Sequence, residues 1–181
     1  GKVTSKDGVS YGLYMITLNI GDTARVEIAA KSGKQVMGLR GNSLTISGNP
    51  TVTVSSEGTS GNYPRGINLA NNLTVSGGAL NVTATGSHAT SDSTGIHVGN
   101  GGDADAIKIS GGRVTVNCNG SAGGGKGIYA YYKTQMRVTG GTVYATGNTT
   151  SIRADTTTGG HTASITLNGM TAKGSPTYNT A

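Results

Sequence analysis

Six residues able to contact a ligand recur at one position of a repeated pattern. The pattern is a Gly, an aliphatic residue, a variable residue and then an aliphatic residue or Ala, as in Gly66-Ile67-Asn68-Leu69. The variable position holds, in order along the chain, Tyr14, Arg40, Asn68, His97, Tyr129 and Arg153, although Arg40 is followed by Gly41 and the last copy has Ser151 in place of the Gly. Tyrosine rings stack on sugar faces and arginine pairs bidentately with carboxylates. This set, here named the first-strand ladder, has the chemistry to bind an anionic glycan.

Three further residues lie next to the ladder in the sequence. Arg65 and Lys126 come just before the variable position of their repeats, and Tyr131 comes just after it. The longest connecting segments, 55–64, 86–93 and 120–125, enter the same strand, and long loops on a rigid scaffold are where binding usually occurs. We therefore predict one ligand site from these nine residues. The alternative is a polar, solvated face of the kind that any soluble β-helix presents.

Acidic residues are too few and too far from the ladder to predict glycoside hydrolysis. A hydrolase needs two carboxyl groups that face the substrate. No ladder position holds Asp or Glu, and the nearest acid, Asp155, is at the end of the series. We therefore expect a protein that is not an enzyme. The chain has eight acids: Asp7, Asp22, Glu27, Glu57, Asp92, Asp103, Asp105 and Asp155.

One acidic cluster is a weak candidate for a metal site. Asp103 and Asp105 lie in the Gly-rich segment 100–105, and oxygen ligands in such a turn could hold calcium. Two carboxylates are few for a dedicated site, and Gly-Asp turns also occur without metal. His88, His97 and His161 fall in different repeats without zinc spacing. We expect no cofactor, with calcium at Asp103 and Asp105 as the alternative.

The ladder requires a scaffold, and two further patterns predict it. One is aliphatic, polar, aliphatic, then Ser or Thr and Gly, as in Leu44-Thr45-Ile46-Ser47-Gly48; the other is a second alternating strand, as in Val52-Thr53-Val54. The second pattern advances in steps of 26, 29, 34, 29 and 29 residues from Ile20 to Leu167. Three strands in a period of this length indicate a solenoid. We predict an all-β, single-domain, right-handed parallel β-helix of about six coils, with three strands per coil in three parallel sheets.

Alternation fixes which side chains face the interior. Successive side chains on a strand point to opposite faces, so the aliphatic residues of each coil should stack on their equivalents one coil away. Cys118 continues an inward series, which predicts a core residue and not a reactive thiol. Gly pairs such as Gly111-Gly112 predict sharp corners with positive φ. The domain should span residues 1–181, with segments 1–11 and 173–181 as caps. The predicted central column contains Ile46, Val75, Ile109, Val138 and Leu167.

Composition limits the partners. Among 181 residues there are 32 Gly, no Phe and no Trp, and the net charge is +6. A basic balance favours an anionic partner, but no nucleic-acid motif accompanies it. No apolar run is long enough for membrane insertion. The chain starts at Gly1 with no Met or signal peptide, so we expect it to be a segment of a longer protein.

The run of Gly-Ile-x-Ala, then Leu-Thr-Ile-Ser-Gly, then Val-Thr-Val resembles the pectate-lyase-like β-helix superfamily over residues 12–172. It is most similar there to non-catalytic carbohydrate-binding β-helix proteins of bacterial surfaces. The resemblance implies a secreted or cell-surface module that binds polysaccharide. The ladder and the net charge of +6 make an acidic, uronate-containing polysaccharide our expectation, and we expect a monomer. Two alternatives stay open. One is a structural stalk or adhesin segment, and the other is a polysaccharide lyase that uses Tyr129, His97 or Arg153 as its base.

Overall fold

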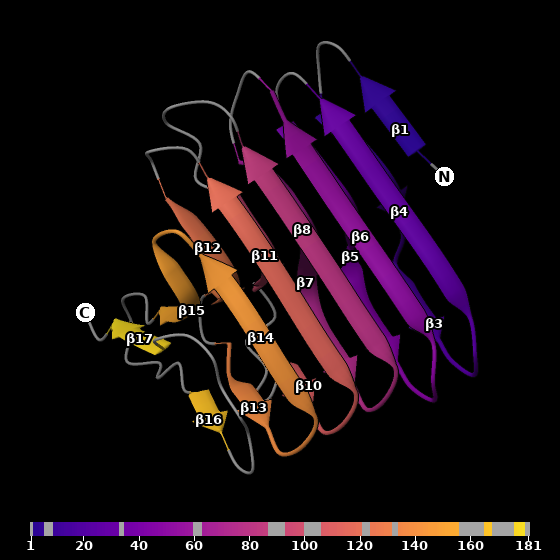
Figure 1. Cartoon of the computed structure of the whole chain (residues 1–181), viewed down its shortest axis with the longest axis vertical. Helices are drawn as coiled ribbons and strands as arrows, with labels where there is room; N and C mark the ends of the chain where they lie inside the picture. Colours follow the sequence, from indigo (N-terminus) through magenta and orange to yellow (C-terminus); the bar gives the residue numbers. More distant parts are fainter. Residues whose placement is uncertain are drawn as a thin grey trace.

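The described part of the chain is a solenoid of parallel strands. The structure, a computed structural model, describes residues 2–5, 9–32, 35–59, 63–86, 93–99, 106–120, 124–131, 134–155, 165–167 and 176–179. These residues contain strands and turns but no helix. Figure 1 shows strands from successive segments lying side by side in wound layers. The predicted all-β parallel β-helix is confirmed.

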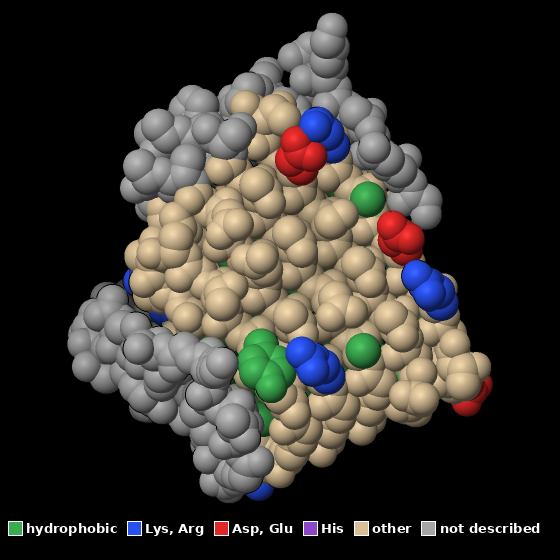
Figure 2. All heavy atoms as spheres, in the orientation of Figure 1, with side chains coloured by type: hydrophobic (Ala, Val, Ile, Leu, Met, Phe, Trp, Pro, Cys, Tyr) green, Lys and Arg blue, Asp and Glu red, His purple; other side chains and the backbone are tan. Residues whose placement is uncertain are grey.

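One layer, sheet A, is a parallel sheet made from the third strand of each repeat. Its β-branched residues alternate with polar ones, which suits a strand that is buried on one face. Its strands run on to Gly58, Gly86 and Gly120, so residues 55–58, which the sequence places in a loop, are strand. Figure 2 shows that the outer face carries few charged or hydrophobic side chains. In order across the sheet, the strands are β1 (Lys2–Ser5), β4 (Arg25–Ser32), β6 (Thr51–Gly58), β8 (Ala79–Gly86), β11 (Arg113–Gly120) and β14 (Thr142–Gly147).

The other layer, sheet B, contains both the first and the second strands of the repeat. In two coils these form one continuous strand, β5 (Gln35–Ile46) and β7 (Arg65–Val75), whereas later coils separate them. The prediction of three separate sheets is therefore wrong. Within β5 the first and second strands of the repeat join with only a register irregularity between Gly41 and Ser43. Two coils later, residues 99–106 separate the first strand, which ends at Val98, from the second, which begins at Ile107. The remaining strands are β2 (Val9–Tyr14), β3 (Thr17–Ile20), β9 (Ser93–Val98), β10 (Ile107–Ile109), β12 (Gly125–Ala130), β13 (Met136–Val138), β15 (Thr150–Asp155), β16 (Ile165–Leu167) and β17 (Pro176–Asn179).

The coil count differs slightly from the six that the sequence predicts, because the solenoid makes about four turns. The coils at both ends are partial in the described residues. Before β2 there is only β1, which pairs with β4, and residues 170–172 of the last coil lie outside the described ranges. The end segments that we expect to be caps contain strands, since β1 extends sheet A and β17 pairs with β15 in sheet B.

The core consists of stacked aliphatic columns between the two sheets. Pairing places Ile46 beside Val75, then Ile109, Val138 and Leu167, as predicted, and the first four are at most 1% exposed. Burying one such side chain contributes about 1.5–3 kcal/mol, so repetition along the column is the main source of stability. The buried thiol of Cys118, 1% exposed, belongs to this interior.

Glycines make the corners that lead into sheet A. Gly48, Gly78, Gly112 and Gly141 have φ between 67° and 77°, a region that L side chains rarely adopt. Gly112 also lies against the preceding corner, where an added Cβ would come within 2.6 Å of the Gly77 carbonyl group. The predicted need for Gly at these corners is therefore both conformational and steric.

Candidate functional site

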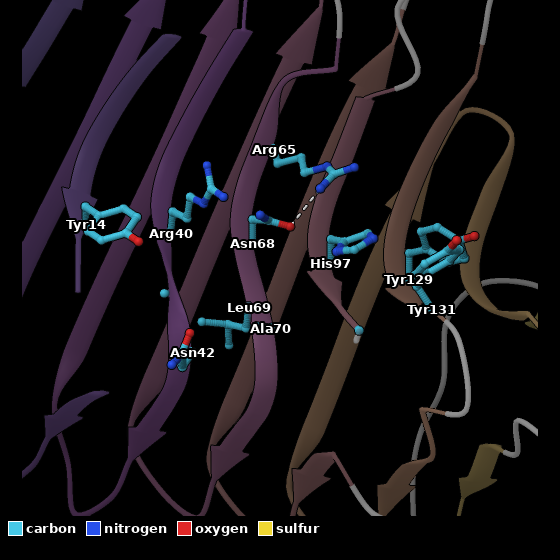
Figure 3. Close-up of a pocket in the computed structure, with 12 residues that line it drawn as sticks. Tyr14, Arg40, Asn42, Arg65, Asn68, Leu69, Ala70, His97, Tyr129 and Tyr131 are labelled. Carbon is cyan, nitrogen blue, oxygen red and sulfur yellow. Dashed lines mark hydrogen bonds between the residues drawn. The ribbon is translucent and has the colours of Figure 1, made fainter. Parts of the chain in front are cut away.

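The first-strand ladder is one continuous column across sheet B. Backbone pairing places Tyr14 beside Arg40 and Arg40 beside Asn68. The column then continues from Asn68 to His97, Tyr129 and Arg153. Figure 3 shows the first five rungs in a row that crosses the strands. The predicted register of the ladder is confirmed, although its role in binding is a separate question.

A pocket of about 620 Å³ lies over the ladder. Seven of the nine predicted site residues line it, and the other two, Lys126 and Arg153, do not. Asn42 in β5, Ala70 in β7 and Gly99, which follows the strand that ends at Val98, also line it. The predicted residues in its lining are Tyr14, Arg40, Arg65, Asn68, His97, Tyr129 and Tyr131.

A second column runs beside the first, three residues earlier in each coil. It contains Arg65 and Lys126, and a Gly follows each of its members from Met37 onward to Lys126. A Cβ on Gly66 would collide with the Val82 side chain, so Gly66 lies against the interior, and Ile67 is also buried there. Two consecutive inward residues leave Arg65 and Asn68 on the same outer face. We name this column the companion ladder: Tyr11, Met37, Arg65, Thr94, Lys126 and Thr150.

Tyr11 and Met37 are functional candidates that sequence reasoning missed, because Tyr11 lies in the presumed cap. The signal that could have found them is the constant three-residue offset from Tyr14 and Arg40. Tyr11 positions the first arginine of the pocket. Arg40 Nη1 donates a hydrogen bond of 2.6 Å to Tyr11 Oη, and its guanidinium lies 5.3 Å from the Tyr11 ring and 5.8 Å from that of Tyr14.

The centre of the pocket is an arginine–asparagine pair. Arg65 Nη1 donates a 2.8 Å hydrogen bond to Asn68 Oδ1, and Asn68 Nδ2 donates to Met37 Sδ at 3.6 Å. These contacts hold the amide and the guanidinium in a defined orientation. A planar guanidinium that is already held in place loses less side-chain entropy when it binds a carboxylate.

The other end of the pocket is aromatic. The ring centroids of His97, Tyr129 and Tyr131 lie 5.3–5.7 Å apart, within the range of favourable ring packing. Tyr129 also receives two cations, since Lys126 Nζ is 5.3 Å and Arg153 Cζ 5.6 Å from its ring centroid. Lys126 and Arg153 therefore contact the aromatic wall without lining the pocket themselves.

His97 differs from the exposed ladder residue that its outward position predicts. Its side chain is only 8% exposed, because Tyr129 and Tyr131 pack against it. Burial, and after it the nearby charges of Arg65 and Lys126, together lower the pKa of His97 from 6.5 to about 3. The imidazole is thus neutral near pH 7. A base of such low pKa is poorly matched to proton abstraction at that pH.

The electrostatic character of the pocket is positive. Arg40 and Arg65 line it, and the acids whose side chains the structure describes, Asp22, Glu27 and Glu57, do not. Glu57 instead pairs with Lys31 on sheet A, with Nζ and Oε1 2.5 Å apart. A concave surface with one sign of charge concentrates ligands of the opposite sign.

The metal predictions fall outside the described part of the chain. Asp103 and Asp105 are not in the described ranges, nor are His88 and His161. Among the residues that are described, no group of three or more His, Cys, Asp or Glu could hold a metal ion. Calcium binding at Asp103 and Asp105 therefore stays a prediction.

Comparison with known proteins found no match to this chain among protein-family models, curated proteins or solved structures. The parallel β-solenoid is the part of the predicted resemblance that the structure supports. Within the described residues, no helix is long and apolar enough to cross a membrane.

Proposed function

We propose that this chain is a non-catalytic carbohydrate-binding module that holds an acidic, uronate-containing polysaccharide in the pocket over the first-strand ladder. The observation that carries the proposal is a pocket lined by two arginines and three tyrosines and by no described acid. Arginines would bind carboxylates, and exposed tyrosine rings would stack on sugar faces. Tyr14 is 65% exposed and Tyr131 is 37% exposed, so both rings are accessible.

The dimensions of the ladder also favour a polymer. Neighbouring strands lie about 4.8 Å apart, so the four steps from Tyr14 to Tyr129 cover about 19 Å. A glycan lying across the strands would contact several coils at once. Such an extended ligand agrees with the resemblance to the surface carbohydrate-binding β-helix proteins, and with a monomeric module outside the cell or on the surface of a bacterium.

Two other functions are less well supported. A lyase with His97 as its base would need a group that accepts a proton near neutral pH, and the lowered pKa of His97 opposes this. A stalk or adhesin segment would need no pocket, but the ladder residues contact one another and form one. We therefore place both below glycan binding.

Affinity electrophoresis in gels that contain polygalacturonate tests the proposal, with a neutral polysaccharide gel as reference. The chain should be retarded only by the acidic polymer, and retardation should decrease as salt rises, because exposed ion pairs are screened. Arg40→Ala should reduce retardation. Arg113→Ala is the matched control, because Arg113 also lies over a tyrosine, 4.8 Å from the ring of Tyr144, but on sheet A.

Two results would count against glycan binding. If the parent chain migrates unretarded at low salt, the stalk replaces it as the leading function. If Arg40→Ala and Arg113→Ala lose equal retardation, the attraction belongs to the net charge of +6 and not to the pocket.

A further inference from the structure

The floor of the pocket contains a neutral ring with unused hydrogen-bonding capacity. His97 lines the pocket and is 92% buried. A neutral imidazole has one N–H donor and one acceptor nitrogen. The ring nitrogen Nδ1 is fully buried and has no hydrogen-bond partner. Nε2 is not one of the fully buried, unpartnered atoms, and the side chain keeps 8% of its surface exposed in the lining of the pocket, so we assign Nε2 as the nitrogen that a ligand would reach.

Neighbouring side chains keep the imidazole ring of His97 neutral. In Figure 3, His97 lies between Asn68 and the pair Tyr129 and Tyr131, in the same row as Arg40. The charged groups that act on it are Arg65 and Lys126, both cations, and both oppose its protonation. Over the range of pH 5 to 8 the ring therefore presents a neutral hydrogen-bonding atom beside the arginines.

We propose that His97 determines the specificity of the pocket by hydrogen-bonding a sugar hydroxyl through Nε2, while Arg65 and Arg40 bind carboxylates. This inference rests on the proposed glycan-binding function and adds a requirement to it. A hydroxyl can donate and accept, so it suits either tautomer of the ring. The pocket thus recognises a hydroxy acid, in which a free hydroxyl accompanies the carboxylate, and not negative charge alone.

The probe that separates hydroxyl recognition from charge is O-acetylated polygalacturonate. Acetylation removes hydroxyl donors and leaves every carboxylate in place. The parent chain should bind the acetylated polymer about two- to tenfold more weakly, which is the range expected for one net hydrogen bond. Its affinity for the unmodified polymer should not change between pH 5 and pH 8 through His97, because the ring stays neutral.

The matched variants are His97→Phe and His97→Gln. Phe keeps a flat ring between the tyrosines but has no nitrogen, so its affinity for the unmodified polymer should fall two- to tenfold and its response to acetylation should disappear. Gln keeps a polar amide and should retain part of that response. Melting curves of both variants check that the fold is intact.

Each outcome is decisive for one claim. If His97→Phe loses as much affinity on acetylation as the parent does, the role of His97 is wrong but the glycan-binding function stands. If the parent binds the acetylated and the unmodified polymer with equal affinity, the role of His97 is likewise wrong and the glycan-binding function likewise stands. If the parent binds neither polymer, the proposed function itself fails.

Discussion

The first-strand ladder and the outer face of sheet A are built by the same backbone and differ only in their side chains. Both are columns of in-register residues that cross parallel strands. On sheet A one such column is Glu27, Thr53, Asn81, Thr115 and Tyr144, most of them short. Figure 2 shows the described part of this face as an even surface. Long side chains in the first-strand ladder contact each other and enclose a pocket. The solenoid therefore aligns the residues of each column, and the length of their side chains determines whether the column encloses a pocket.

Val75→Asp gives the largest effect and tests the alternation on which both faces depend. Val75 is fully buried in sheet B, so its replacement leaves an unpaired charge in the core. We expect a loss of about 3–5 kcal/mol in the free energy of unfolding, measured by urea denaturation. Thr74→Asp, one residue away on the outer face, is the control and should cost far less. Equal costs at the two positions would mean that inside and outside are wrongly assigned.

Gly112→Ala tests whether the corners set the register of sheet A. The φ of 73° and the nearby Gly77 carbonyl both oppose a Cβ. The expected loss is about 1–3 kcal/mol by thermal or urea unfolding. Thr115→Ala on the strand that follows should change stability by about 0.5 kcal/mol or less. A stable Gly112→Ala protein would show that the corner adapts, and that neither face depends on it.

Acid should destabilise the ladder through His97. The unfolded chain binds a proton at this residue below about pH 6.5, whereas the folded protein does not until about pH 3. The unfolded state therefore gains stability relative to the folded state as the pH falls through 6.5. Between pH 7 and pH 5 the parent should lose about 1–2 kcal/mol more than His97→Gln. Parallel stability profiles of the two proteins would contradict the neutral state of the ring.

Thr53→Ala should give the smallest effect, because Thr53 is exposed on the flat face of sheet A. We expect a change of about 0.5 kcal/mol or less in stability and no change in retardation by polygalacturonate. A clear loss of retardation would overturn the contrast between the two faces, since it would place glycan contacts on sheet A.

The repeat made most of the scaffold predictable. Equivalent aliphatic residues at a steady interval were sufficient to place Val75 beside Ile109 and Asn68 beside His97, because parallel pairing of identical coils leaves little freedom of register. The joined strands β5 and β7 were not predictable, since short connectors can either break a strand or bend it.

Side-chain environment was harder to predict than register. Strict alternation places His97 outward and so predicts exposure, but burial depends on Tyr131, which follows the strand and packs over the ring. The companion ladder was missed for a similar reason. The Gly after each of its members from Met37 to Lys126 interrupts the period of two, so Arg65 and Asn68 share a face at a spacing of three.

The fork in sheet B gives this protein a place to change without losing its fold. Where β7 is followed by separate strands, each branch keeps its own pairing partners, β9 on one side and β10 on the other. Insertions between the branches therefore leave the backbone register untouched. The residues that open these connectors, Gly99 and Tyr131, are also part of the pocket wall. A change in the length of a connector would thus reshape the pocket wall, while the repeated coil pattern would keep the strands in register.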